Sequence, residues 1–387
     1  MSYSSPVSVS HAQELARRQW PRLIFDFIDG AAGEGLGLAR AMRSIQELSL
    51  QPRSLVDVQH RDLTTNLLGR DYAVPFGIAP MGMCNLAWPG ADVHLSSLAR
   101  DEDLPLGIST AASTPMERMM EIAGERCWFQ LYPGSNQELQ ADLLDRAEQS
   151  GCDVLLLTVD VPQLAPRPRE KRSGFKVPFR LTPRLFTDFA LHPYWSLATL
   201  FHGVPYTANI DRNRFGAFQR DEGRDRATWE TLDELRRRWK GKLVIKGITS
   251  DSAALKARDA GADAVYVSGH GGRQLESLPP PIYQLAAIRD AVGEDFPLIY
   301  DTGIRGGEDI VTALAVGASF VCLGRPFLYG LGCGGRRGLR AIFHILTEEV
   351  SSTMAQLGIC HVSELSRDVL SLWQPPGCPA NLVRNVN

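Results

Sequence analysis

Short runs of apolar residues, many of them β-branched, recur eight times along the chain. After most of these runs, apolar residues recur at helical spacing. Near-continuous apolar strands are typical of a parallel sheet whose faces are covered by helices. The predicted strands are centred near Ile78, Ile108, Phe129, Leu156, Val244, Val265, Ile299 and Val321.

Three of the helical segments end in the same way, with a glycine followed by two residues and a strand. The glycines are Gly151, Gly261 and Gly317. Glycine at this place is a signal for the end of a helix. Strand and helix units repeated eight times predict an α/β fold of the (β/α)8 TIM-barrel type. A doubly wound sheet is the alternative, weakened because no predicted strand is followed by G-x-G-x-x-G.

Two regions depart from this repeat within one predicted domain, 1–387. Residues 1–75 form an N-terminal extension with a helical stretch, and residues 164–228 interrupt the fourth unit. The barrel is predicted over 76–345, and a C-terminal helix and tail over 346–387. An insertion this long is usually a lid or a disordered segment. Because it follows strand four, it should lie over the face that carries barrel active sites.

Composition narrows the class of protein. The 387 residues are 44% hydrophobic with a net charge of −3, so nothing favours nucleic acid as a partner. Seven scattered cysteines form no C-x-x-C pair, which indicates reduced thiols, no metal site and no disulfide framework. The N-terminus lacks a signal-peptide pattern and no apolar run is long enough to span a bilayer. A cytoplasmic location is therefore expected.

Polar residues stand at the carboxyl end of nearly every predicted strand, where barrel enzymes keep their chemistry. Lys246 and Gln130 emerge from otherwise apolar strands, and burying them without partners costs several kcal/mol. A bound polar ligand would supply partners; ordinary turn residues are the alternative. The strand-end residues include Ser109, Gln130, Tyr132, Thr158, Asp160, Lys246, Ser268, His270 and Asp301.

Two loops sharpen this picture. In residues 267–277, three glycines surround His270 and Arg273, which suits either a general base on a close-approach loop or a plain tight turn. After strands seven and eight come glycines, Arg305, Arg325 and a helix start, the usual phosphate position in this fold. The alternative for Arg325 is a surface ion pair.

The fragment "SGHGGRQLE", residues 268–276, is similar to the signature S-N-H-G-A/G-R-Q-L/V-D/E. On this motif the chain resembles the FMN-dependent L-2-hydroxy acid oxidase and dehydrogenase family, which includes glycolate oxidase, lactate dehydrogenase and mandelate dehydrogenase. The match runs from "LIFDFIDGAAGE" to "LGRPFLYGL". Residues 191–210 look most like the membrane-associated mandelate dehydrogenase branch and its bacterial lactate relatives.

The resemblance implies oxidation of a small-molecule L-2-hydroxy acid to the 2-oxo acid. His270 would be the base and Asp160 would hydrogen-bond it, while Tyr132 would contact the hydroxyl side of the substrate. Arg167 and Arg273 would hold the substrate carboxylate, since guanidinium groups bind carboxylates bidentately.

The resemblance also implies FMN as the cofactor, and the absence of a dinucleotide motif favours FMN over FAD or NAD. Lys246 would face the N1–O2 edge of the flavin and Asp301 the ribityl chain, with Gly303, Arg305, Gly324 and Arg325 at the phosphate. The cofactor-binding residues implied are Ala79, Pro80, Met81, Gly82, Ser109, Gln130, Thr158, Lys246, Ser268, Asp301, Gly303, Arg305, Gly324 and Arg325.

Three positions depart from the family pattern. Phe27 stands where a tyrosine usually contacts the substrate carboxylate, Gly269 replaces an asparagine and Met81 replaces a threonine. Loss of the tyrosine donor predicts larger apolar or aromatic, mandelate-like or lactate-like acids rather than glycolate as substrates. An FMN-dependent isomerase, or a flavin-binding barrel without turnover, are the alternatives.

The insertion suggests where the electrons go. Residues 175–207 gather aromatic and aliphatic residues with Lys176, Arg180 and Arg184, which suits peripheral contact with the inner face of a membrane. A lid or subunit contact is the alternative, and the resemblance implies a homotetramer. The electron acceptor would be a quinone, a dye-like carrier or O2. The resemblance also favours a dehydrogenase, because the mandelate dehydrogenase branch has a glycine at the position of Gly82, where oxidases often carry alanine.

Overall fold

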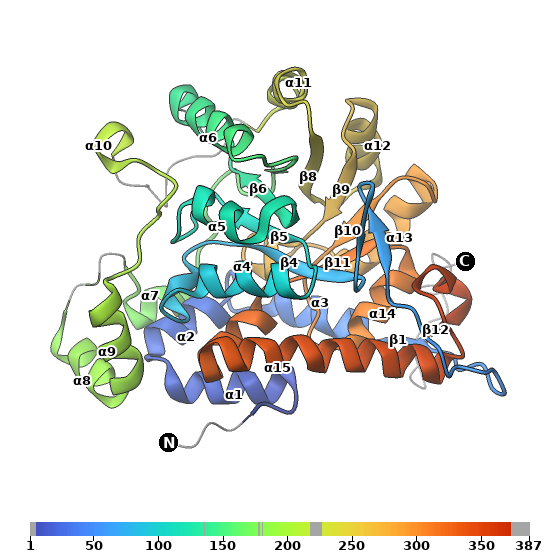
Figure 1. Ribbon diagram of the computed structural model, residues 1–387, viewed down its shortest axis with the longest axis horizontal. Coiled ribbons are helices and arrows are strands. Elements are labelled where there is room, and N and C mark those ends of the chain that lie inside the picture. Colours follow the sequence, from blue (N-terminus) through green and yellow to red (C-terminus); the bar gives the residue numbers. More distant parts are fainter. Residues whose placement is uncertain (1–4, 135, 177–178, 180, 217–226, 373–387) are drawn as a thin grey trace.

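Eight parallel strands close into a barrel in the computed structural model, which describes residues 5–134, 136–176, 179, 181–216 and 227–372 (Figure 1). Closure is made by β11 pairing with β4, with Val321 opposite Phe76. This confirms the predicted (β/α)8 barrel and excludes the doubly wound sheet. The strands are β4 Phe76–Met81, β5 Leu106–Ser109, β6 Cys127–Leu131, β7 Val154–Thr158, β8 Lys242–Ile248, β9 Ala264–Val267, β10 Leu298–Tyr300 and β11 Phe320–Leu323.

Helices surround the barrel, one after each strand, with the insertion preceding the helix of the fourth unit (Figure 1). The last is kinked at Gly334 and Gly335 and continues through position 345, where the barrel was predicted to end. It continues because Ile342, Leu346 and Val350 keep apolar residues on one buried face. The helices are α4 Ala91–Asp101, α5 Met116–Ala123, α6 Gln137–Gln149, α11 Trp229–Arg238, α12 Asp251–Asp259, α13 Pro281–Val292, α14 Gly307–Val316 and α15 Arg325–Leu357.

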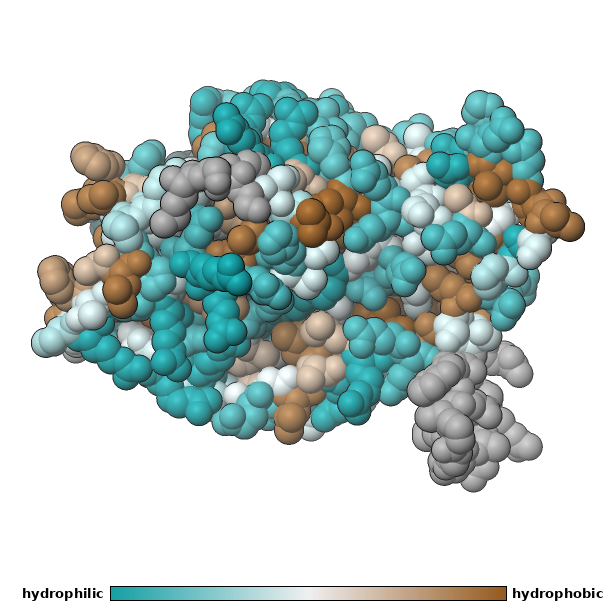
Figure 2. All heavy atoms as spheres, turned by 90° about the horizontal axis from the view of Figure 1, so that it is seen from below, coloured by the Kyte–Doolittle hydropathy of each residue, from teal (hydrophilic) through white to brown (hydrophobic). Residues whose placement is uncertain are grey.

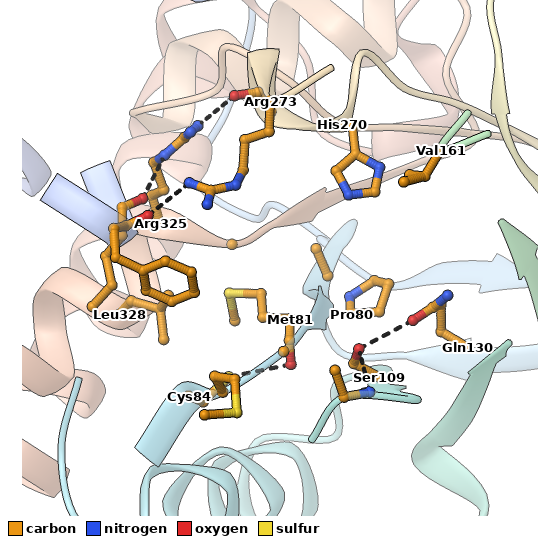
Figure 3. A pocket seen from close by; sticks show the side chains of 18 of the residues that line it. Pro80, Met81, Cys84, Ser109, Gln130, Val161, His270, Arg273, Arg325 and Leu328 are labelled. Carbon is orange, nitrogen blue, oxygen red and sulfur yellow. Dashed lines mark hydrogen bonds between the residues drawn. The ribbon is translucent and has the colours of Figure 1, made fainter. Parts of the chain in front are cut away.

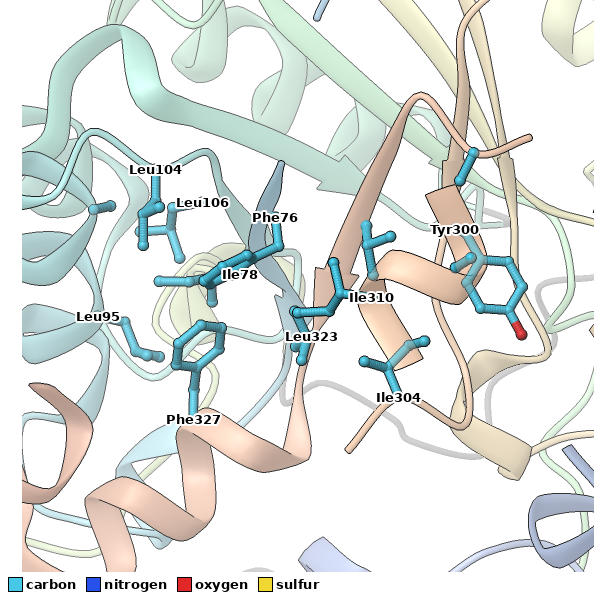
Figure 4. Close-up of a cluster of buried hydrophobic side chains, with 14 of the residues drawn as sticks. Phe76, Ile78, Leu95, Leu104, Leu106, Tyr300, Ile304, Ile310, Leu323 and Phe327 are labelled. Atoms are coloured by element: carbon cyan, nitrogen blue, oxygen red, sulfur yellow. The ribbon is translucent and has the colours of Figure 1, made fainter. Parts of the chain in front are cut away.

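Side chains of each strand alternate between two cores. On β7, Leu155 and Leu157 belong to the cluster between barrel and helices, whereas Val154 and Leu156 belong to the cluster inside the barrel. Figure 4 shows part of the outer cluster, where Phe327 at the start of α15 lies near Ile78. Fully burying one such side chain contributes about 1.5–3 kcal/mol. The barrel is therefore a rigid support for the residues at its rim.

The N-terminal extension packs against the barrel, its last helix and the last described strand. Tyr72 of its hairpin belongs to the inner cluster, and β1 pairs antiparallel with β12 near the end of the described chain. Figure 1 shows α1 lying along α15. Its elements are α1 Val9–Gln19, α2 Arg22–Asp29, α3 Leu36–Gln46, β1 Leu48–Leu50, β2 Thr65–Leu67 and β3 Arg70–Tyr72, with β12 at Leu370–Leu372.

The described part of the insertion forms four helices, so it is neither patternless nor a simple loop. Pro168, Pro183 and Pro193 each occupy the first turn of a helix, where the missing N–H costs nothing. Figure 1 shows the second and third helices projecting to one side of the barrel. The helices are α7 Pro168–Ser173, α8 Pro183–Leu191, α9 Pro193–His202 and α10 Arg212–Phe215.

Candidate active site

A cavity of about 920 Å³ opens at the carboxyl ends of the barrel strands. Figure 3 shows His270 and Arg273 on one side of it and Pro80, Met81 and Ser109 on the other. Asp160 and Ser268 are not among its lining residues but lie directly behind it, bonded to residues that are. The predicted residues lining the cavity are Phe27, Ala79, Pro80, Met81, Gly82, Ser109, Gln130, Tyr132, Thr158, Arg167, Lys246, His270, Arg273, Asp301, Gly303, Arg305, Gly324 and Arg325.

His270 and Asp160 form a hydrogen-bonded pair from two strand ends. The distance from His270 Nδ1 to Asp160 Oδ1 is 2.9 Å. Burial lowers the pKa of His270 below its ordinary value, and Lys246 adds to this, while Asp160 opposes it. Burial would raise the pKa of Asp160, but His270 and Lys246 outweigh it and the pKa is lowered. An ionised aspartate therefore supports a histidine that is neutral near neutral pH.

The glycines around His270 allow close approaches that side chains would block. A Cβ on Gly272 would lie 2.7 Å from Leu38 Cβ, and the residue has a φ of +71°. The amides of Gly269 and Gly271 both donate to the Thr302 hydroxyl at 3.0 Å. The loop is thus fixed against the neighbouring strand end, and His270 itself adopts a φ of 53°.

Lys246 is a buried cation with its partners in place. Its Nζ donates to Ser268 Oγ at 2.9 Å and lies 3.5 Å from Asp301 Oδ2. Burial would lower the pKa of Lys246, but Asp301 and Asp160 outweigh it and the pKa is raised. A permanent positive charge therefore stands at the base of the cavity, where it would stabilise negative charge on a bound ligand.

Gln130 is fixed by its two neighbours. It donates from Nε2 to Thr158 Oγ1 at 2.9 Å and accepts from Ser109 Oγ at 3.1 Å. All three residues were predicted at the carboxyl ends of strands. They meet because parallel strands in register align those ends. They form a polar shelf of defined orientation.

Arg325, predicted at the phosphate end of the site, lines the cavity and is held by backbone carbonyl groups. Arg325 donates from all three guanidinium nitrogens to carbonyl oxygens, those of Ile28, Gly271 and Gly30. Burial lowers its pKa to about 10, with Arg305 contributing. Its side chain therefore fastens α2 to the His270 loop, rather than forming the surface ion pair of the alternative.

The N-termini of α14 and α15 differ in whether they are free to bind an anion. The start of α14 is already occupied, since the amides of Arg305 and Gly306 donate to Asp309 Oδ2 at 2.7 and 3.1 Å. By contrast, α15 begins at the cavity with no side-chain cap and no acidic residue in its first turn. Its N-terminus suits a phosphate group.

The two arginines predicted to bind a carboxylate share an acidic partner that sequence reasoning missed. Arg273 Nη2 donates to Glu170 Oε1 at 2.7 Å, and Arg167 Nη1 lies 3.5 Å from the same oxygen. Arg167 also donates to the carbonyl of Arg273, at 3.2 Å from Nη2. The only signal for Glu170 was its position three residues after Arg167, one turn along a helix.

Phe27 is stacked on a second missed residue, Phe175 of the insertion. Their ring centroids are 4.2 Å apart with an interplanar angle of 5°. The guanidinium of Arg273 lies 5.2 Å from the Phe27 centroid and donates to the Phe27 carbonyl at 2.7 Å. At the position where the family usually has a tyrosine, this protein therefore has an apolar aromatic surface beside the arginines.

A closed barrel whose strand-end cavity holds a buried lysine, a histidine–aspartate pair and clustered arginines has the architecture of a barrel enzyme. The model of the FMN-dependent dehydrogenase family matches residues 16–372. The chain therefore belongs to the FMN-dependent dehydrogenase family. This confirms the resemblance, the oxidoreductase class and FMN as the cofactor.

Similar proteins extend over nearly the whole chain. It is 34% identical over 379 residues to a putative L-lactate dehydrogenase of Mycobacterium tuberculosis, covering 96% of this chain and 92% of that protein. It is 33% identical to the (S)-mandelate dehydrogenase of Pseudomonas putida, covering 94% and 93%. The solved monotopic membrane protein (S)-mandelate dehydrogenase superposes with a TM-score of 0.91 at 32% identity, covering 96% of this chain and 100% of that one.

The residues present fit a flavin mononucleotide. A Cβ on Gly324 would lie 3.1 Å from Met81 Sδ, and a Cβ on Gly82 would lie 3.0 Å from Ala111 Cβ. A side chain at either position would therefore crowd its neighbour in the cavity wall. Lys246 would supply charge for the flavin ring, and the start of α15 with Arg305 would supply it for the phosphate. The roles of the individual residues stay predictions.

Proposed function

We propose that this protein oxidises L-2-hydroxy acids, preferentially those with larger apolar or aromatic side chains, to 2-oxo acids. The observation that supports this most is that one cavity holds a histidine with an ionised aspartate behind it, two arginines and the polar shelf of Ser109, Gln130 and Thr158. FMN, when bound, supplies the acceptor for two electrons from the carbinol carbon.

His270 would take the proton released in this oxidation. Its Nδ1 is engaged with Asp160, so Nε2 is the nitrogen that receives a proton from the substrate. Asp160 then stabilises the imidazolium that forms, since its carboxylate lies 2.9 Å away. The Asp160–His270 pair thus determines both the orientation and the basicity of the ring.

Arg167 and Arg273 would orient the substrate through its carboxylate, with Tyr132 near the hydroxyl group. The side chain of the substrate would pack on the Phe27–Phe175 pair, which presents apolar surface to the cavity. An aromatic or branched substituent gains from this contact, whereas glycolate has no side chain to place there.

Membership of the FMN-dependent dehydrogenase family counts against the two alternatives, an FMN-dependent isomerase and a flavin-binding barrel without turnover. An isomerase would not need two arginines for one carboxylate, and a barrel without turnover would not need a buried histidine–aspartate pair. Both alternatives predict that no 2-hydroxy acid yields a 2-oxo acid.

A substrate panel tests the proposal. FMN-loaded protein is assayed with a redox dye against glycolate, L-lactate, L-2-hydroxyisovalerate and (S)-mandelate, with the opposite enantiomers of the three chiral acids as controls. We expect the larger L-acids to give the higher kcat/KM values. Glycolate as the best substrate would contradict the proposed preference, and no turnover with any acid would contradict the proposed function.

We further propose that α8 and α9 make peripheral contact with a membrane and that the acceptor is a quinone-like carrier. On these helices and the following loop, large apolar side chains are exposed, Leu200 by 76% and Phe201 by 85%. Figure 2 shows hydrophobic side chains gathered at the edge where Figure 1 places α8 and α9. Among the described residues, every helix is too short or too polar to cross a bilayer.

The anchoring of this surface supports the proposal. Trp195 of α9 is buried against Phe179 and Phe189 and donates from Nε1 to the carbonyl of Leu86 at 2.8 Å. The inner faces of α8 and α9 are therefore attached to the barrel, and their outer faces point to solvent. A similar solved protein is described as monotopic, which agrees with this arrangement.

Vesicle flotation separates the two interpretations of this surface. The triple variant Leu197→Ser, Leu200→Ser, Phe201→Ser should lose binding to anionic vesicles but keep turnover with a soluble dye, while Leu55→Ser, an exposed apolar control, should bind normally. If wild type does not float and the triple variant instead alters the oligomeric state, the surface is a subunit contact.

A further inference from the structure

Glu170 is a buried carboxylate in the wall of the cavity, and the proposed chemistry gives it no part. It is 5% exposed and lines the cavity together with both arginines. Its Oε1 accepts from Arg273 at 2.7 Å and lies 3.5 Å from Arg167. The arginines that await a substrate carboxylate are thus already in contact with a protein carboxylate.

The position of Glu170 is fixed by its neighbours on α7. Arg169 donates to Asp26 Oδ1 and to Asp29 Oδ2, each at 2.6 Å, and so fastens α7 to α2. The carbonyl of Glu170 accepts from the amide of Phe175 at 3.1 Å. The Glu170 carboxylate therefore stays in the wall of the cavity unless α7 itself moves.

The charges that surround this site make it sensitive to the charge of the ligand. A bound monocarboxylate adds one negative charge beside Glu170, which Arg167 and Arg273 balance. A second carboxylate on the same ligand would bring a further negative charge into a partly buried site, where like charges repel strongly. Lys171 and Lys176 also line the cavity but are exposed, so solvent screens them.

We propose that Glu170 is a specificity-determining residue that restricts the site to monocarboxylates and rejects 2-hydroxy dicarboxylates. This inference rests on the proposed function, because it assumes that Arg167 and Arg273 receive the carboxylate of a 2-hydroxy acid. It also assigns Glu170 a positioning role, since the same oxygen holds the Arg273 guanidinium toward the cavity wall.

A purely structural role makes a different prediction. If Glu170 only supported Arg273, its replacement would weaken mono- and dicarboxylates by the same factor. Repulsion instead predicts a change in the ratio of the two affinities. The ratio of the affinities for monocarboxylates and dicarboxylates therefore distinguishes repulsion by the Glu170 charge from structural support of Arg273.

The test is an equilibrium titration of oxidised FMN-loaded protein with two ligands of similar size, 2-oxoglutarate and its 5-methyl ester. Dissociation constants are read from the change in flavin absorbance. Wild type should bind the ester at least about tenfold more tightly. Glu170→Gln should reduce this preference by about tenfold, whereas Glu170→Asp should retain it. Glu34→Gln is the control, an exposed carboxylate 3.6 Å from Arg172 of α7.

Each outcome decides the matter. A wild type that binds the diacid as tightly as the ester overturns the inference without any variant, so folding of Glu170→Gln is not required. An unchanged ratio in Glu170→Gln overturns it as well, as does failure of both ligands to perturb the flavin. If the affinities behave as expected but no 2-hydroxy acid is oxidised, the proposed function fails and charge selection stands.

Discussion

Two parts of the cavity wall, one at the ends of the barrel strands and one from the extension and insertion, are held in position by different contacts. Lys246, Ser268 and Asp301 come from adjacent barrel strands and bond directly to one another at 2.5 to 3.5 Å. A second part of the wall, beside Arg273, contains Phe27 on α2 and Glu170 on α7 and comes from the extension and the insertion. It is attached through arginine side chains that donate to backbone carbonyls, as Arg325 does to Ile28 and Gly30.

This difference separates chemistry from selectivity. Groups at the strand ends are positioned by barrel closure, which tolerates little change because the interior is close-packed. Groups on the extension and insertion are positioned by a few hydrogen bonds, so their identities can vary without loss of the fold. We therefore expect changes on the first side to alter the rate of oxidation, and changes on the second to alter the choice of acid.

The largest effect is expected for His270→Ala on the strand-end side. Loss of the base should lower the rate of flavin reduction by about 10² to 10⁴-fold, because general base catalysis contributes about this much. FMN content should stay at the wild-type level, measured by the flavin absorbance after heat release. A variant that is reduced at nearly the wild-type rate would show that His270 is not the base.

A smaller effect is expected for Asp160→Asn. The lost charge-assisted hydrogen bond, worth about 1.5–3 kcal/mol, should lower the maximal rate by about 10- to 100-fold. Because the base must be neutral, wild-type activity is lost as pH falls through the His270 pKa, which burial places below the ordinary value of about 6.5.

The pH profile gives a second test of this pair. Asp160 raises the pKa of His270, so its replacement should move the acid limb of the rate profile to lower pH. Burial and Lys246, which lower that pKa, are unchanged. An acid limb that stays in place or moves to higher pH would contradict a functional Asp160–His270 pair.

The smallest effect is expected for Phe27→Tyr, in the part of the cavity wall formed by the extension and the insertion. A hydroxyl near the arginines adds about one hydrogen bond, or roughly 1 kcal/mol, for small polar acids. The ratio of kcat/KM for glycolate to that for (S)-mandelate should rise several-fold, with little change in the limiting rate. Equal effects on both acids would mean that Phe27 is simply core packing against Phe175.

The same division explains how much the sequence could predict. All eight strands, and the position of Gln130 and Thr158 at strand ends, followed from periodicity and from the rule that barrel strands align their carboxyl ends. The pairing of His270 with Asp160 was implied by the resemblance to the family and not by the pattern. Glu170 and Phe175 did not follow, because neither lies on a strand and their neighbours are set by how α7 folds back. The backbone contacts of Arg325 could not be predicted either, because every residue carries a carbonyl group and the sequence does not indicate which of them accept a hydrogen bond.

The most direct measurement of the central claim is an anaerobic absorbance spectrum of FMN-loaded protein after addition of a larger L-2-hydroxy acid such as (S)-mandelate. The account predicts loss of the oxidised-flavin band together with one equivalent of the 2-oxo acid, and no change with the opposite enantiomer. A protein that holds FMN but keeps its oxidised spectrum with every aliphatic and aromatic L-2-hydroxy acid would contradict it.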